Sequence, residues 1–168
     1  MPTTNLMSKI RCYDYVNHPY AMVRDALTKD APQLFQCATK AAATRAESVA
    51  SELRAGIGGI SVEADVRICV KSIEEKVETM SVPVTRLHVE WEAATMPSLF
   101  PIMKADISIY PLTATETQLD FQGVYEPPLG AVGKAVNAII GHRIAEASVH
   151  RFIEDVARHL RLIGTASR

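Results

Sequence analysis

Hydrophobic and polar positions alternate with a period of two along several segments of this chain. The longest segment runs over Ile60–Lys71, and shorter ones cover Leu87–Ala93, Met103–Ile109 and Leu119–Tyr125. Ile10–Val16 shows the same pattern near the N-terminus. A period of two predicts β-strands. One apolar and one polar face are typical of an antiparallel sheet covered on one side, because parallel strands buried on both faces read as continuous apolar runs.

Helical spacing separates the first predicted strand from the others. Asn17 can cap a helix, and the apolar residues that follow it share one helical face, which predicts a short helix to about Lys29. The alanine-rich run Gln33–Arg54 predicts a second helix, which the glycines of 56–59 end. These helices can cover the apolar face of the sheet.

The segment Ile73–Ser81 leaves three interpretations open. It can extend the preceding strand, form a loop or make a helical turn. Its three glutamates predict a solvated segment.

The last predicted strand, Thr117–Tyr125, leads through Glu126–Gly130 into a long helix that reaches about Ile163. Pro127 and Pro128 force the chain out of the sheet at this point. The helix carries two apolar arcs about half a turn apart. The first arc, which we assign to the sheet, holds Val132, Val136, Ile139, Ile140, Arg143 and Ala147, and the second holds Ile153, Val156, Leu160 and Ile163. Either the helix kinks near Gly141, the interpretation that we prefer, or its halves face different surfaces, one of them a partner subunit.

Composition limits the class of protein. A length of 168 residues, with 48% hydrophobic and 22% charged residues, predicts a single globular domain over residues 1–168. A net charge of -1 gives no broad positive field, so we expect no nucleic-acid partner. Cys12, Cys37 and Cys69 stand far apart, which favours free thiols in a reducing cytoplasm. We expect no signal peptide and no membrane insertion.

The order strand, two helices, antiparallel strands and long closing helix resembles the helix-grip fold of the START-like superfamily. The stretch Gly123–Gly130 looks like the last-strand-to-helix junction of its bacterial cyclase-like members. The resemblance implies an α+β fold in which the sheet wraps on the C-terminal helix. It also implies an apolar ligand, as in polyketide cyclases, lipid-transfer proteins and hormone binders. About five strands are predicted here, where seven is usual in the fullest members.

The residues expected at such a ligand site come from the last three strands and the closing helix. They are Trp91, Met103, Phe121, Tyr125, Val136, Ile140 and Arg143. For each apolar residue taken alone we favour ordinary core packing, and for Arg143 we favour an internal salt bridge over ligand binding.

Candidate chemistry is sparse. His142, Glu146 and His150 recur at a spacing of four, but three ligands along one straight helix reach one ion poorly, so we predict no metal and no cofactor. Three hypotheses follow. The first is binding of an apolar or amphipathic molecule, lipid or polyketide-like. The second is a polyketide cyclase or dehydratase in which Arg143, His142 or Tyr125 acts on a carbonyl or proton. The third is a homodimeric interaction module that uses the arc Ile153–Ile163.

Overall fold

The computed structural model describes residues 8–30, 33–35, 37–38, 66–77, 82–93, 103–125 and 134–163. Five strands form one antiparallel sheet in the order β1-β5-β4-β3-β2. The strands are β1 (Ser8–Val16), β2 (Val66–Val77), β3 (Pro83–Ala93), β4 (Met103–Pro111) and β5 (Thr117–Tyr125). The helix α2 (Lys134–Arg161) closes the fold, and residues 20–30, 33–35 and 37–38 are also helical.

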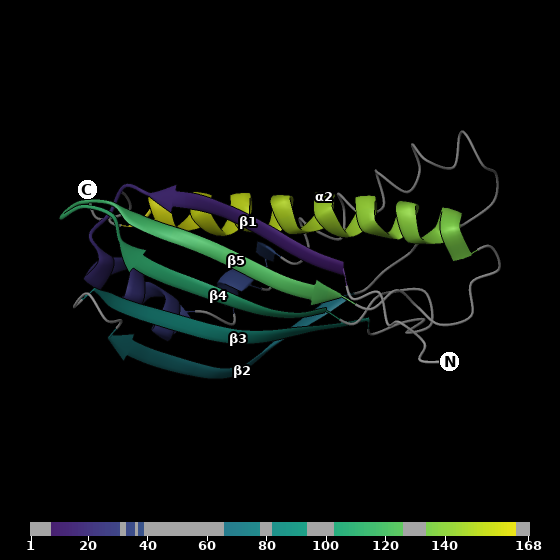
Figure 1. Ribbon diagram of the computed structural model, residues 1–168. Coiled ribbons are helices and arrows are strands. Elements are labelled where there is room, and N and C mark those ends of the chain that lie inside the picture. Colours follow the sequence, from purple (N-terminus) through teal and green to yellow (C-terminus); the bar gives the residue numbers. More distant parts are fainter. Residues whose placement is uncertain are drawn as a thin grey trace.

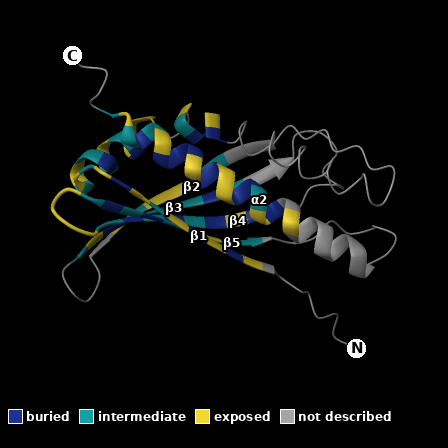
Figure 2. Cartoon of the chain, turned by 90° about the horizontal axis from the view of Figure 1, so that it is seen from above, coloured by how far each residue is buried: buried dark blue, intermediate teal, exposed yellow. Residues whose placement is uncertain are grey.

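One face of the sheet carries the core. Along β4, buried positions alternate with more exposed ones, beginning at buried Met103. α2 runs along this inner face (Figures 1 and 2), and its residues share a single core cluster with the strands and the helical segments of 20–38. The prediction of an α+β fold with a sheet covered on one side is confirmed, because the opposite face is polar and partly exposed.

The strand predictions hold in all five described strands, with boundaries shifted by a few residues. The segment from Ile73 continues β2 as far as Val77, so the first of the three interpretations is confirmed for residues 73–77, and residues 78–81 lie outside the described part of the chain. A register shift between Val70 and Ser72 bulges β2 at Lys71. Such a bulge moves later residues to the opposite face, which explains why the alternation read from the sequence fades here. Residues 60–65, 39–56 and 126–133 lie outside the described part of the chain.

Among the residues of α2 whose side chains the structure describes, those of the C-terminal half supply most of the helix's contribution to the core. Val149, Phe152 and Val156 are fully buried, together with Ile153 and Leu160. The third hypothesis, an exposed partner surface along Ile153–Ile163, is therefore wrong, because these side chains already pack inside their own domain.

The assignment of the first arc to the sheet also fails where it can be tested. Arg143 is exposed. The true buried face contains Ala145, Ser148 and Asp155, which are small or polar residues that an apolar arc leaves out. α2 continues as a helix through Gly141 (Figure 1), so the helix does not break there, and a bend at Gly141 stays a prediction.

Polar contacts hold the end of α2 to β1. The Arg161 guanidinium donates to the Tyr15 carbonyl at 2.7 and 3.2 Å and to the Asp14 carboxylate at 2.7 Å. His18 Nε2 lies 2.9 Å from the Arg161 carbonyl, and Thr117 Oγ1 donates to the His18 carbonyl at 2.8 Å. Because the last carbonyls of a helix lack partners within it, His18 acts as a cap for α2.

No described helix is apolar over a length that would cross a bilayer.

Candidate functional site

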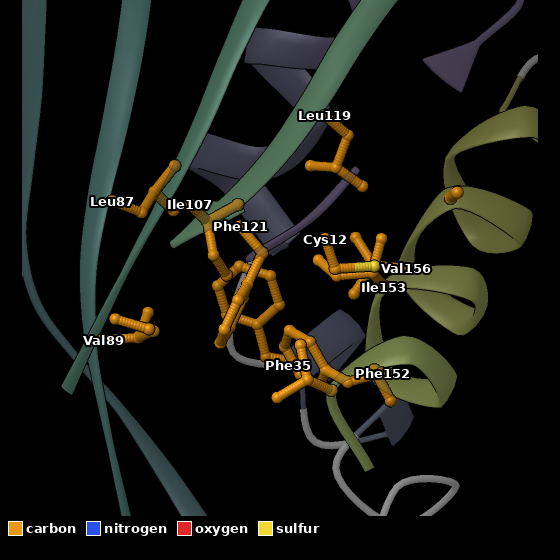
Figure 3. Close-up of a cluster of buried hydrophobic side chains, with 14 of the residues drawn as sticks. Cys12, Phe35, Leu87, Val89, Ile107, Leu119, Phe121, Phe152, Ile153 and Val156 are labelled. Carbon is orange, nitrogen blue, oxygen red and sulfur yellow. The ribbon is translucent and has the colours of Figure 1, made fainter. Parts of the chain in front are cut away.

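Three phenylalanines join the sheet, α2 and the helical segment before β2. The ring of Phe152 on α2 lies 5.7 Å from that of Phe35 and 6.4 Å from that of Phe121 on β5 (Figure 3). All three side chains are fully buried. We call this group the phenylalanine cluster. It lies between the two ends of the layer of side chains enclosed by the sheet and α2, which we call the inner space.

Large side chains fill the end where α2 finishes. Leu119 and Ile109 are cross-strand partners there, and α2 adds Val156 and Leu160. Each is fully buried. This packed end therefore stabilises the fold and is not where we expect a ligand to bind.

At the other end, where α2 begins, the sheet carries small residues at its centre. Ala105 pairs with Gly123, which pairs on its other side with Ile10. A methyl group built on Gly123 would lie 2.7 Å from Phe121 Cε1 and 3.3 Å from the sulfur of Met103. Phe121 and Met103 thus converge above Gly123, because this residue has no side chain to keep them apart.

Backbone register brings the remaining predicted strand residues to this end. Trp91 pairs with Met103, and Met103 pairs with Tyr125, so the three positions form one row across β3, β4 and β5. Met103 is 3% exposed. Directly opposed positions in an antiparallel sheet lie about 4.5 to 5.5 Å apart, so the structure places the predicted residues of the strands next to one another.

The predicted residues of α2 have different outcomes. Val136 and Ile140 belong to the helix, but the structure does not describe their side chains. Arg143 has an exposed side chain and is not a buried charge. Phe152, which the sequence interpretation missed, is the helix residue that contacts Phe121. Its signal was available, because Val149, Phe152, Ile153 and Val156 follow the helical spacing of a buried stripe.

A cysteine and a histidine meet beside this space. Cys12 Sγ lies 3.3 Å from His150 Nδ1. Burial, helped by the charge of Asp14, raises the pKa of the Cys12 thiol from 9.0 to about 11. A nucleophilic cysteine needs its thiolate, so we interpret the pair as a structural hydrogen bond between thiol and imidazole.

Other titratable groups considered from the sequence lie on the outer face. His88 contacts the carboxylates of Asp106 through Nδ1 and of Glu74, at 3.4 Å, through Nε2. Both ring nitrogens are engaged, so this group links three strands. Within the described ranges, no cluster of three or more histidine, cysteine or acidic residues could hold a metal ion. Glu146 of the predicted stripe is exposed, and the side chain of His142 is outside the description.

Comparison with known proteins agrees with this architecture. No protein-family model and no curated protein matches the sequence. Among solved structures, the Zhui aromatase/cyclase from Streptomyces sp. R1128 superposes with a TM-score of 0.50 at 12% identity, covering 96% of this chain and 98% of that chain. Ara h 8.0201 superposes with a TM-score of 0.47 at 7% identity, covering 92% of this chain and 97% of that chain. A conserved protein from Geobacillus kaustophilus superposes with a TM-score of 0.46 at 14% identity, covering 91% of this chain and 95% of that chain.

The likeness to the aromatase/cyclase shows a shared fold over nearly the whole of both chains. The chain has the helix-grip fold, as the resemblance in its sequence predicts. At 12% identity the likeness extends to the fold alone.

Proposed function

We propose that this protein binds an apolar or amphipathic small molecule, lipid or polyketide-like, between the inner face of the sheet and the N-terminal half of α2. The observation that carries the proposal is the difference between the two ends of the inner space. Small residues at Ala105 and Gly123 stand beside Met103 at one end, whereas large side chains fill the other. Apolar pockets of binding proteins combine such a wall with few polar groups.

The proposed wall comprises residues on both sides of the space. Trp91, Met103, Phe121 and Tyr125 contribute from the sheet, and Val136 and Ile140 contribute from α2. Support comes from the register that aligns Trp91 with Met103 and Tyr125.

Arg143 takes a separate role in the proposal. Its exposed side chain lies on α2 nine residues beyond the first helical position, Lys134. A guanidinium at the rim can pair with the anionic head of an amphipathic ligand without being buried itself. An anionic ligand such as a fatty acid should therefore bind more tightly than its neutral alcohol, and Arg143→Gln should abolish that difference.

The first test is native mass spectrometry of the purified protein, followed by denaturing extraction and identification of whatever is released. A lipid or apolar metabolite in stoichiometric amount supports the proposal and names the chemical class. A protein that carries nothing and also fails to bind sodium oleate or 1-naphthol in titrations overturns it.

The chain provides its own reporter for those titrations, because Trp91 is its single tryptophan. We expect oleate or 1-naphthol to change the emission of Trp91 in a saturable manner. Ala105→Leu should weaken binding by filling the wall beside Gly123. Lys104→Leu is the matched control, since it adds the same side chain to the exposed outer face of the same strand. Equal binding by both variants contradicts the proposed location.

Catalysis is the second candidate, as a cyclase or dehydratase acting on a polyketide-like chain. Such an enzyme needs at least two polar groups that converge on the substrate. At the Met103 end, the inward side chains that the structure describes are apolar, namely those of Ile10, Met103, Ala105 and Phe121. The high pKa of Cys12 also argues against a cysteine nucleophile. Binding without turnover is therefore the function that the geometry favours.

A further inference from the structure

Side-chain size falls abruptly between two neighbouring rows in the middle of the sheet's inner face. The first row crosses four strands at the phenylalanine cluster, and its residues are all buried, namely Leu87, Ile107, Phe121 and Cys12. The next row towards Met103 holds Val89, Ala105, Gly123 and Ile10. On β4 the step is from Ile107 to Ala105, and on β5 it is from Phe121 to Gly123. A ligand at the Met103 end would therefore meet the first row as the end wall of its site.

The ring of Phe121 is held from several sides. Phe152 of α2 lies 6.4 Å from it at an interplanar angle of 65°, and Phe152 is in turn 5.7 Å from Phe35 (Figure 3). Aromatic pairs favour such inclined arrangements over a face-to-face stack. Because a close-packed interior resists changes in volume, the ring cannot move towards the packed end without displacing these neighbours.

Met103 differs from Phe121, although both side chains converge above Gly123. The Met103 sulfur lies 3.3 Å, and Phe121 Cε1 2.7 Å, from the position that a methyl group on Gly123 would take. Methionine is unbranched and has three rotatable bonds, so it adapts to the shape of its neighbours. A ligand can therefore turn Met103 aside and pack against it, but the ligand stops at the ring of Phe121.

The side chains around this ring are apolar. Ile10, Met103 and Ala105 are all buried. Cys12 is the one residue of the two rows whose described side chain has a polar atom, and its sulfur lies 3.3 Å from His150 Nδ1. Burying a polar group without a hydrogen bond is costly. The deep end of a bound ligand should therefore be hydrocarbon.

We infer that Phe121 limits how deeply a ligand enters, and that the ligand enters with a hydrocarbon end first. The inference rests on the proposed function, because it concerns the same site, and it narrows the class of ligand to molecules that are apolar at one end. Such a molecule keeps its polar group near the rim, where we propose that Arg143 acts, while its apolar end contacts the ring of Phe121. Phe121 is thus a specificity-determining residue, since it limits the length of hydrocarbon that the site can bury.

Calorimetric titration of the full chain with saturated fatty acids, from hexanoate to tetradecanoate below their micelle-forming concentrations, tests the inference. We expect each added methylene to tighten binding about fourfold, as burial of one methylene should, until the chain reaches Phe121. Affinity should then stop rising with length. Phe121→Ala removes the obstacle, so in this variant affinity should continue to rise over longer chains.

Two further variants separate the role of this ring from a general loss of packing. Phe121→Leu keeps a large apolar side chain, so it should fold even if Phe121→Ala does not, and it should move the length limit in the same direction by less. Leu119→Ala is the matched control, because Leu119 is fully buried on the same face of β5 but lies on the packed side of Phe121. It should destabilise the protein and leave the length limit unchanged.

The orientation of the ligand is tested on the wild-type chain alone. The acid ω-hydroxydecanoate carries a hydroxyl at its tip and should bind at least about tenfold more weakly than decanoate, because burial of that hydroxyl beside Phe121 is costly. Equal affinity for the two acids overturns the inference, as does a length limit that Phe121→Leu leaves unchanged, although both results would still support binding. Absence of binding at every length overturns the inference together with the proposal of a lipid ligand.

Discussion

The two ends of the inner space are built from the same sheet and the same helix but differ in side-chain volume. At the end where α2 finishes, Leu119, Ile109 and Leu160 are fully buried, and Arg161 holds the helix to β1. At the end where α2 begins, Ala105 and Gly123 occupy the middle of the sheet. A fold can therefore keep one end as its stabilising core and leave the other available for binding.

The phenylalanine cluster lies between the packed end and the end at which we propose that a ligand binds. Phe121 stands on β5, yet its ring leans over Gly123 toward Met103, whereas Phe152 supports the ring from α2. Variants on either side of this boundary should have different consequences. Packed-end variants should lower the free energy of unfolding, and variants beyond the cluster should also change ligand affinity.

The largest expected effect on stability is that of Phe152→Ala. This side chain is fully buried and contacts the rings of both Phe35 and Phe121. Truncation of a buried phenylalanine costs about 3 to 5 kcal/mol because it leaves a cavity. Urea denaturation followed by circular dichroism would measure the loss. Ile73→Ala, at a position that is 42% exposed, serves as the control and should cost far less.

Met103→Ala should destabilise the protein less than Phe152→Ala does, but it should also weaken ligand binding. We expect a loss of about 2 kcal/mol in the free energy of unfolding, at the low end of the range for truncation of a buried methionine. The rise in melting temperature caused by sodium oleate should shrink as well. Ile109→Ala at the packed end is the comparison: it should lower the melting temperature without reducing the shift that oleate produces. A variant at Met103 that keeps the full oleate shift would place the ligand elsewhere.

Gly123→Ala examines the boundary itself. The added methyl group would lie 2.7 Å from Phe121 Cε1, so the ring must move against a packed core. Overpacking of this kind costs about 1 to 2 kcal/mol. Phe121→Leu removes the obstructing ring atoms, so the loss caused by Gly123→Ala should largely disappear in that background. Additive losses in a double-mutant cycle measured by urea denaturation would mean that Phe121 and Gly123 are independent.

A smaller effect is expected for Arg161→Ala at the end of α2. The guanidinium donates to the Tyr15 carbonyl and to the Asp14 carboxylate. Because the side chains of Arg161 and Asp14 are both partly exposed, the loss in the free energy of unfolding should be about 1 kcal/mol. Urea denaturation followed by circular dichroism would measure this loss, and an unchanged free energy of unfolding would show that these contacts contribute nothing to stability.

The fold could be predicted to a large extent, because the one-sided strands keep a strict alternation of apolar and polar residues. Leu87, Val89, Ile107 and Phe121 are all buried as that alternation predicts. The bulge at Lys71 could not be predicted, because an extra residue changes the alternation only among the residues that follow it in the strand.

The candidate site itself stays a prediction, and the structure shows where the backbone places its residues. Trp91, Met103 and Tyr125 form one row across the sheet, since cross-strand pairing follows from the order of the strands. Phe121 lies beyond the next inward-facing row, which holds Ala105 and Gly123. The helix face was assigned wrongly because the buried stripe of α2 includes Ser148 and Asp155, whereas Arg143 follows apolar residues on the other side. Polar residues obtain partners only in the folded chain, as Asp155 does with Arg158 and His159. A count of apolar residues cannot show this.

The last prediction concerns the reactivity of the three free thiols. Cys37 is exposed, Cys69 is intermediate and Cys12 is buried against His150. Because alkylation requires a thiolate, and burial raises the pKa of Cys12 to about 11, iodoacetamide at pH 8 should modify Cys37 first and Cys12 last. Peptide mass spectrometry over time would give the order of alkylation.

The same pKa predicts that the free energy of unfolding falls as pH rises from 9.0 toward 11, because the unfolded chain then loses the proton that folded Cys12 retains. Cys12→Ala should abolish this part of the pH dependence, and early alkylation of Cys12 in the wild type would show that the space beside the phenylalanine cluster admits small reagents.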